Sequence, residues 1–292
     1  MNIHNYYLDG ELGRGEYGVT YFAHDANGNA VAIKTINLEE LQDFDISDVI
    51  DTLTNLSKNN CFIYVTCYYD SFIDILDGIE TAFIVSEYID GGSLEDLLKV
   101  NPNPSSDLLP SFLWPLMLQL LLGLKYIHDT GYAHRDIKPD NILITKDYII
   151  KYIDFDFACL QKCRLRNCRN TCQGTPGTIY YIPPEYFDVN KVESLIISQA
   201  HDMWSLAIVM FNLCNGQNEF PFQTTTLDGR LLSSEDLIEH IVMAPEYLSN
   251  YKGDDGRTNV FVNSLLVNDW KLRPTANEAL TQFIYDVLAN IY

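Results

Sequence analysis

Residues 134–141 have the sequence His-Arg-Asp-Ile-Lys-Pro-Asp-Asn, which brings a carboxylate, a cation and a carboxamide close together. These groups suit a reaction in which a hydroxyl loses a proton beside a polyanion. Asp136 is predicted to accept the hydroxyl proton, Lys138 to neutralise a transferring phosphoryl oxygen, and Asn141 to offer its oxygen to Mg²⁺. Because Pro139 fixes its φ angle and stops a helix from continuing, we expect these groups to sit on a rigid loop.

A glycine-rich turn lies far upstream of this loop. Gly13, Gly15 and Gly18 fall between two strand-like segments, and Val-Thr-Tyr-Phe follows the third glycine. A dinucleotide-binding fold would begin a helix there, whereas β-branched and aromatic residues favour a strand, so the glycines are predicted to cap a hairpin. We expect its backbone N–H groups to cover phosphates, with Val19 against a base. A tight turn without a ligand is the alternative.

The next strand-like segment, residues 30–36, carries a lysine. Successive side chains of a strand point to opposite faces, so Ala32 and Lys34 are expected to share one face. A small residue and a cation would then face the same site as the glycine turn. A solvated lysine on the strand surface is the alternative.

Strand-like and helical patterns follow along the chain. Residues 37–58 predict an acidic, amphipathic helix, and residues 61–72 and 81–88 have strand-like composition. The two glycines at 91–92 interrupt both periodicities and indicate a linker. Beyond them, Phe112–Asp129 predicts a long buried helix.

These segments resemble the signature motifs of the eukaryotic-type protein kinases. The similarity extends from residue 7 to about residue 285 and includes Asp-Phe-Asp at 154–156. It implies an α+β, bilobal protein-kinase-like fold. Residues 1–88 would form a small antiparallel-sheet N-lobe and residues 89–292 a larger, mainly helical C-lobe. The implied activity is transfer of the γ-phosphoryl group of ATP to protein serine or threonine.

The resemblance also implies which groups bind ATP. Lys34 would contact the α- and β-phosphates, and backbone groups of Glu87 and Ile89 would bond the adenine. Ser86 would form the wall at the back of the adenine pocket. The nucleotide site would be completed by Gly13, Gly15, Gly18, Val19 and Ala32.

The Asp154–Asp156 segment is implied to bind the metal. Asp154 would bind Mg²⁺ together with Asn141, since Mg²⁺ prefers hard oxygen ligands. Asp156 stands where the family normally has glycine. Aspartate tolerates left-handed backbone better than most residues, so we expect the turn to be retained. The movement of the segment is expected to be more restricted than with glycine.

In the family a helix glutamate pairs with the strand lysine, and this chain has no clear counterpart. Glu39 and Glu40 come early, whereas Asp48 and Asp51 lie nearer the expected place. One of these two aspartates is therefore expected to pair with Lys34. The missing glutamate and the altered Asp-Phe-Gly segment leave a second function open, that of a pseudokinase that binds nucleotide or a partner without turnover.

The segment around residue 178 implies the substrate class. By the resemblance, Thr178 would bond Asp136 and Lys138, as in serine/threonine kinases, and Arg273 would form a buried ion pair with Glu185.

Regulation is implied by the residues between Asp154 and Glu185. Thr171 and Thr175 are the candidate phosphorylation sites there. Arg135, which precedes the catalytic aspartate, is placed to receive such a phosphate.

The same segment holds four cysteines, with three or four residues between successive ones: Cys159, Cys163, Cys168 and Cys172. Four thiolates can surround a tetrahedral Zn²⁺, and the basic residues between them favour thiolate. The gaps differ from the paired two-residue spacing that is typical of zinc sites. A structural Zn²⁺, unliganded thiols and a disulfide are therefore the alternatives.

The chain of 292 residues has 47% apolar residues and a formal net charge of −21. Such an acidic protein is expected to repel nucleic acid and anionic membranes and to attract basic protein substrates, unless the charge serves solubility alone. We find no signal peptide, and the most apolar run, 112–127, is interrupted by polar residues and short for a membrane span. Seven cysteines then indicate reduced thiols in an intracellular, cytoplasmic or nuclear protein, which we expect to be a monomer.

Overall fold

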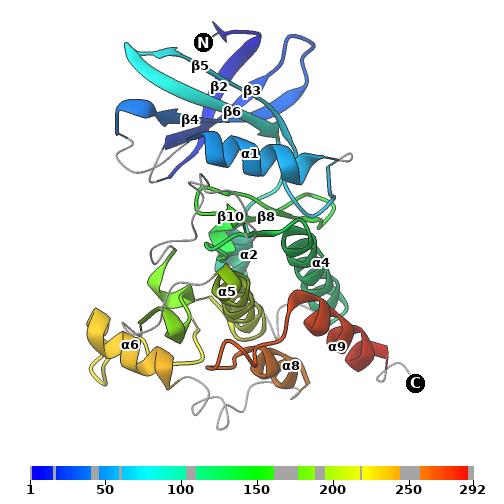
Figure 1. The fold of residues 1–292 in the computed structure, drawn as a ribbon, viewed down its shortest axis with the longest axis vertical. Coiled ribbons are helices and arrows are strands. Elements are labelled where there is room, and N and C mark those ends of the chain that lie inside the picture. The colour runs from blue at the N-terminus through cyan, green and yellow to red at the C-terminus, as the bar shows by residue number, and fades with distance from the viewer. Residues whose placement is uncertain are drawn as a thin grey trace.

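The computed structural model has a β-sheet at one end and a group of helices at the other (Figure 1). This arrangement confirms the predicted α+β fold, with a sheet in the N-terminal part and helices in the C-terminal part. Structure is described for residues 2–15, 18–40, 46–58, 61–102, 110–160, 177–187, 195–217, 219–243 and 257–288.

The N-terminal sheet has six antiparallel strands in the order β1-β2-β3-β4-β6-β5. One face buries a small apolar core that includes Ala23, Ile33 and Phe83. The strands are β1 (Asn2–Ile3), β2 (Tyr6–Arg14), β3 (Gly18–His24), β4 (Ala30–Asn37), β5 (Tyr68–Leu76) and β6 (Ile79–Glu87).

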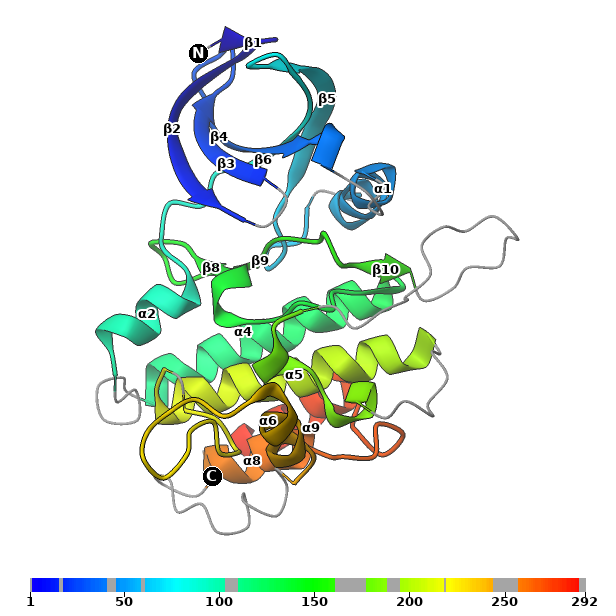
Figure 2. The same ribbon diagram turned by 90° about the vertical axis from the view of Figure 1, so that its left-hand side faces the viewer.

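Helix α1 (Ile46–Ser57) lies beside this sheet and follows the short 3₁₀ helix η1 (Leu38–Glu40) (Figure 2). Its buried residues Leu53 and Leu56 belong to the same apolar cluster as Ile84 of β6. The cluster continues through Tyr132 into the helical part of the molecule. One hydrophobic core therefore joins α1 to both parts of the fold.

The C-terminal part is built on the long helices α4 and α5 (Figure 2). Helix α4 confirms the long helix predicted at Phe112–Asp129, and residues 201–214 of α5 are all buried. The helices are α2 (Leu94–Val100), α4 (Pro110–Asp129), α5 (Leu195–Asn215), α6 (Ser234–Val242), α8 (Arg257–Leu265) and α9 (Ala276–Leu288). Among the described residues, we find no helix with both the length and the hydrophobicity of a membrane span.

Two small sheets lie between the large sheet and the long helices (Figure 2). Strand β7 (Tyr132–Ala133) pairs with β10 (Cys159–Leu160), and β8 (Ile142–Ile144) pairs with β9 (Ile150–Tyr152). The segments that carry Asp136 and Asp154 connect these strands. Short 3₁₀ helices complete the region: η2 (Pro139–Asn141), η3 (Ile179–Tyr181) and η4 (Pro184–Phe187).

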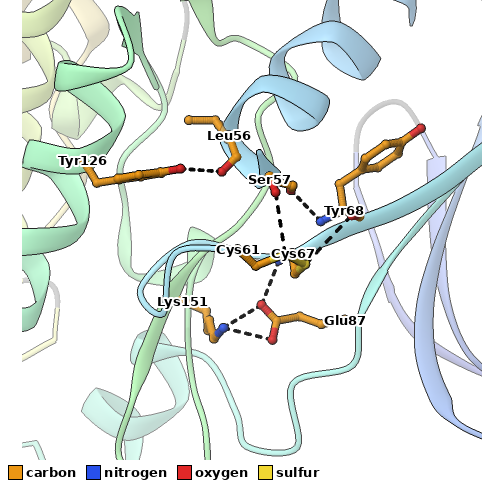
Figure 3. Close-up of a disulfide and its surroundings, with 8 residues drawn as sticks. All are labelled: Leu56, Ser57, Cys61, Cys67, Tyr68, Glu87, Tyr126 and Lys151. Carbon is orange, nitrogen blue, oxygen red and sulfur yellow. Dashed lines mark hydrogen bonds and ion pairs between the residues drawn. A yellow bond between two sulfur atoms is a disulfide. The ribbon is translucent and has the colours of Figure 1, made fainter. Parts of the chain in front are cut away.

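The segment between α1 and β5 differs from the predicted strand over 61–72, since β5 takes up only its last residues. Cys61 and Cys67 are joined by a disulfide, with their Cα atoms 5.3 Å apart (Figure 3). This pair corrects our expectation that the thiols are reduced. The segment follows β9 instead of the large sheet, because the Thr66 N–H donates to the Tyr152 carbonyl at 2.9 Å and the Tyr152 N–H donates to the Tyr64 carbonyl at 3.0 Å.

Candidate active site

Asp136 lies at the centre of a compact polar cluster. Its Oδ2 atom accepts hydrogen bonds from Lys138 Nζ and Asn141 Nδ2, each at 2.8 Å, and Asn141 Nδ2 also donates to the Asp136 carbonyl at 2.9 Å. Lys138 Nζ in turn donates to Thr178 Oγ1 at 3.1 Å. Within this described region, Thr178 reaches Asp136 through Lys138 and not by the direct bond that we predicted. The polar residues of the 134–141 loop therefore meet as expected.

The loop is held in place by Asp202 of α5. The Asp202 carboxylate accepts the N–H groups of His134 at 2.8 Å and Arg135 at 2.7 Å, and it lies 2.9 Å from His128 Nε2. Burial alone would raise the pKa of Asp202, but the hydrogen bond with His128 and the nearby histidines lower it overall. Arg135 has a φ of 69°, which is costly for a residue other than glycine. The buried carboxylate thus fixes a strained turn.

Lys34 of β4 meets the Asp154–Asp156 segment. Its Nζ atom lies 2.7 Å from Asp154 Oδ1 and also donates to Asp156 Oδ2. Phe155, between the two carboxylates, is buried and packs against the ring of His134, with centroids 4.7 Å apart. The left-handed residue of this turn is Asp154, with a φ of 61°, and not Asp156 as we expected.

The charges in this group shift one another's pKa. Burial lowers the pKa of Lys34, but Asp156 and Asp154 outweigh it, so the net shift is upward. Burial and the charge of Asp154 raise the pKa of Asp156 to about 7. Burial would raise the pKa of Asp154 as well, but Lys34 lowers it overall. Asp154 is therefore ionised at neutral pH, as a metal ligand must be.

The helix acids that we predicted to pair with Lys34 lie elsewhere. Among the described residues, the ion pairs of Lys34 run to the Asp154–Asp156 segment and not to Asp48 or Asp51 of α1. The pKa of Tyr132 is raised mainly by burial, and the charges of Asp51 and Asp48 add to the shift.

The glycine turn joins β2 and β3. A Cβ atom on Gly18 would meet the Thr35 carbonyl oxygen at 1.7 Å, so the close approach of β4 requires glycine there. Among the described residues, a Cβ on Gly13 would meet nothing within 4 Å, and one on Gly15 would meet only the Gly18 oxygen at 4.0 Å. Val19 follows and is half-buried. The part of the turn that the structure describes therefore has space around Gly13 and Gly15, as a turn that covers a ligand needs.

Strand β4 has the predicted alternation. Ala32 and Lys34 are half-buried, whereas Val31 and Ile33 between them are buried, which confirms that Ala32 and Lys34 share a face. Across the sheet, Ala32 lies opposite Ser86 of β6.

The last residue of β6 contacts the segment that precedes β5, on the side of β6 that faces away from β4. The Glu87 N–H donates to the Cys67 carbonyl at 2.9 Å, so this N–H is already used within the protein. The Glu87 carboxylate accepts the Cys67 N–H at 2.8 Å and pairs with Lys151 of β9 (Figure 3). Ile89, two residues further on, is buried. Binding of adenine by the backbone here stays a prediction.

The residues predicted to bind Mg²⁺ present suitable atoms. Asn141 uses its Nδ2 atom for Asp136, which leaves the carboxamide oxygen for a cation. Asp154 uses Oδ1 for Lys34, and its side chain is 35% exposed. Amide and carboxylate oxygens are ligands that Mg²⁺ prefers, so this pair of residues fits the ion.

Most of the cysteine cluster lies outside the described residues. Cys159 of β10 is buried and takes part in a disulfide. Within the described ranges, no three His, Cys, Asp or Glu side chains are grouped to hold a metal ion. The other predicted zinc ligands and the candidate phosphorylation sites lie outside the described residues: Cys163, Cys168, Cys172, Thr171 and Thr175.

The predicted ion pair of Arg273 and Glu185 is confirmed. Arg273 Nη1 lies 2.7 Å from Glu185 Oε1, and Nη2 lies 2.9 Å from Oε2, with both side chains fully buried. This bidentate contact ties η4, which follows Thr178 in the chain, to the segment between α8 and α9.

Comparison with known proteins identifies the class. A family model described as the protein kinase domain matches residues 6–284. The chain therefore belongs to the protein kinase family.

Its relatives include kinases from plants, fungi and an amoeba. The MAP3K epsilon protein kinase 1 of Brassica napus is 33% identical over 215 residues, which cover 71% of this chain and 15% of the relative. The serine/threonine-protein kinase ste20 of Aspergillus oryzae is 34% identical over 215 residues, or 73% and 23% of the two chains. The serine/threonine-protein kinase dst1 of Dictyostelium discoideum is 30% identical over 277 residues, or 94% and 34%. The chain thus spans about a third or less of the length of these relatives.

Proposed function

We propose that this chain transfers the γ-phosphoryl group of ATP to serine or threonine hydroxyls of proteins. The observation that carries the proposal is the contact of Lys138 with both Asp136 and Thr178. A base, a cation and a threonine from the segment before Glu185 meet at one point, as hydroxyl phosphorylation requires. Family membership and the names of the relatives support the same activity.

In this mechanism Asp136 accepts the proton of the attacking hydroxyl. Lys138, 2.8 Å from Asp136, neutralises the negative charge on the transferring phosphoryl oxygens. Lys34 orients the α- and β-phosphates from the opposite side. Mg²⁺, when bound through Asn141 and Asp154, neutralises phosphate charge. Catalysis then comes mostly from positioning and electrostatic stabilisation.

The nucleotide would lie between the glycine turn and the end of β6. Backbone groups around Gly13 and Gly15 would cover the phosphates, since those positions have free space. The Glu87 carbonyl and the Ile89 N–H would bond the adenine. In this proposal, residues 1–88 and 89–292 are the two lobes of a single kinase domain.

The partners are proposed to be basic proteins. A net charge of −21, with Asp140 beside the catalytic loop, favours basic residues near the acceptor hydroxyl. We further propose that the domain acts as a monomer.

The alternative function is that of a pseudokinase, which the missing helix glutamate and the replacement of glycine by Asp156 would favour. Lys34 nevertheless has two carboxylate partners, so the lysine can be held in place without the helix. We therefore retain the enzyme as the function.

The test is phosphoryl transfer from γ-labelled ATP with Mg²⁺ to a mixture of basic proteins. The wild type should label serine and threonine, and the matched Asp136→Asn variant should lose at least about 10²-fold in rate. Absent transfer, or equal transfer by the two proteins, would reject the proposal in favour of a binding protein.

A further inference from the structure

The ammonium group of Lys34 lies between two carboxylates of one short segment. Asp154 Oδ1 is 2.7 Å away, and Asp156 Oδ2 is hydrogen-bonded to the same nitrogen. The side chain of Asp154 is 35% exposed, whereas that of Asp156 is 5% exposed. Asp156 is thus the partner that solvent and salt screen least.

The segment is built to keep Asp156 in this place. Phe155 anchors it, because this residue is 2% exposed and its ring packs against that of His134. The Ala158 N–H donates to the Phe155 carbonyl at 3.1 Å and closes a turn around Asp156. The left-handed φ of 61° at Asp154 directs the chain so that carboxylates two residues apart both reach Lys34.

Chemistry separates the roles of the two carboxylates. Asp154 is the proposed Mg²⁺ ligand, and a carboxylate that shares its charge with a dication neutralises Lys34 less well. Asp156 carries no such assignment, so its carboxylate can serve Lys34 alone. Helix α1 does not take over this role, because the described ion pairs of Lys34 are the two above.

We propose that Asp156 is the positioning residue of Lys34, in place of an acid from helix α1. The inference rests on the proposed function and deepens it. Because Asp156 and the proposed metal ligand Asp154 belong to one segment, the lysine is oriented by the same element that would hold the metal. The orientation of Lys34 then does not depend on where α1 lies.

The test compares Asp156→Asn, which keeps the size and removes the charge, with Asp156→Glu, which keeps the charge. Asp48→Asn and Asp51→Asn on α1 are the matched controls. Asp156→Asn should lower kcat at least about tenfold, with a smaller change in KM for ATP and no change in the Mg²⁺ concentration needed for half-maximal rate. Asp156→Glu should recover part of the loss, and both α1 variants should keep the wild-type rate.

A second readout follows Lys34 itself. The nucleotide-free protein is treated with an amine-reactive succinimidyl ester at fixed pH, and acylation of the Lys34 peptide is followed by mass spectrometry. An ammonium that loses a carboxylate gives up its proton more readily, so Asp156→Asn should acylate severalfold faster at Lys34. The thermal midpoint of each variant is measured as well, to check that the variant is folded.

The other possible results would reject either the role of Asp156 or the proposed function. Unchanged acylation and unchanged kcat in Asp156→Asn would overturn the inference. A raised Mg²⁺ requirement with unchanged acylation in Asp156→Asn would mean that Asp156 serves the metal. A comparable loss of kcat in Asp48→Asn or Asp51→Asn would mean that an acid of α1 positions Lys34. Either result would also overturn the inference. A wild type that transfers no phosphoryl group would reject the proposed function, while the acylation rates would still show whether Asp156 holds Lys34.

Discussion

The ammonium group of Lys151 lies 2.7 and 2.9 Å from the two carboxylate oxygens of Glu87. Glu87 ends β6, whereas Lys151 belongs to β9, which leads to Asp154. The same carboxylate accepts the Cys67 N–H at 2.8 Å. One side chain therefore holds together the end of the sheet, the segment after α1 and the strand before the proposed metal ligand (Figure 3).

Truncating this carboxylate should destabilise the fold. The Lys151 and Glu87 side chains are 11% and 19% exposed, so Glu87→Ala leaves a poorly solvated cation and should lower the free energy of unfolding by about 2–3 kcal/mol. Glu87→Gln should cost less, because the amide oxygen still accepts the Cys67 N–H. Denaturant unfolding followed by tryptophan fluorescence measures both.

The control for this pair is Lys146→Met. Lys146 and Asp90 are 3.5 Å apart, and their side chains are 75% and 43% exposed. Loss of such a surface pair should change the free energy of unfolding by less than about 1 kcal/mol. Equal effects of Glu87→Ala and Lys146→Met would show that the Glu87 contact adds little to stability.

Replacing the phosphate lysine should remove activity and keep the fold. Methionine fills much of the volume of the lysine stem, so Lys34→Met should fold normally. Loss of a preorganised electrostatic contact predicts a fall in kcat of about 10²–10³-fold or more. Steady-state kinetics with saturating ATP, beside circular dichroism, checks this. A fall of less than about tenfold would mean that Lys34 does not orient the phosphates.

Local chemistry made the catalytic loop predictable from the sequence. Asp136, Lys138 and Asn141 lie within six residues of one another, so their types and spacing already bring them together. The alternation of Ala32 and Lys34 was predictable for the same reason, since a strand fixes which side chains share a face.

Contacts between distant segments were not predictable in this way. Lys34 and Asp156 are 122 residues apart, and a pairing of Lys34 with α1 was equally compatible with the sequence. The strand predicted over 61–72 failed because its first residues bond to Tyr152, a partner that strand-like composition does not reveal. The disulfide of Cys61 and Cys67 depends on that same path of the chain.

Removing the Cys61–Cys67 disulfide should destabilise the chain moderately. The two cysteines are six residues apart, and the loop-entropy estimate for so short a loop is about 2 kcal/mol. We expect Cys61→Ser and Cys67→Ser each to lower the free energy of unfolding by that amount. A reductant also opens the disulfide of Cys159, which the wild type and both variants share. It should therefore destabilise the wild type by about 2 kcal/mol more than it destabilises either variant. Equal effects of the reductant on the wild type and on the two variants would contradict this.

Acid should weaken the fold through His201. Burial, together with Arg135 and Arg273, lowers the pKa of His201 to about 3, although Asp202 acts in the opposite direction. The unfolded chain takes up this proton below about pH 6.5, and the folded chain does so only near pH 3, so stability falls as the pH drops between these values. From pH 7 to pH 5 the loss from this histidine should be about 2 kcal/mol.

The measurement is the free energy of unfolding at pH 7 and pH 5 for the wild type and for His201→Gln. The variant lacks the group that titrates, so its stability should fall by about 2 kcal/mol less over this range. Parallel pH dependences in the two proteins would show that His201 does not contribute.

The adenine pocket should accept bulky inhibitors because of Ser86. Ser86 is half-buried on β6, where it lies opposite Ala32 on one side and Tyr68 on the other. A small residue there leaves space behind the adenine, so ATP-site ligands with a large aromatic group should inhibit the wild type. Ser86→Met should fill that space and weaken the binding of such ligands at least about tenfold, which corresponds to about 1.4 kcal/mol of lost binding free energy.

The matched control for Ser86→Met is a ligand without the aromatic group, which should inhibit both proteins alike. The KM for ATP should also change little. If the bulky ligand inhibits both proteins equally, Ser86 does not line the pocket, and the residues that bind adenine are shifted by at least one position from Glu87 and Ile89.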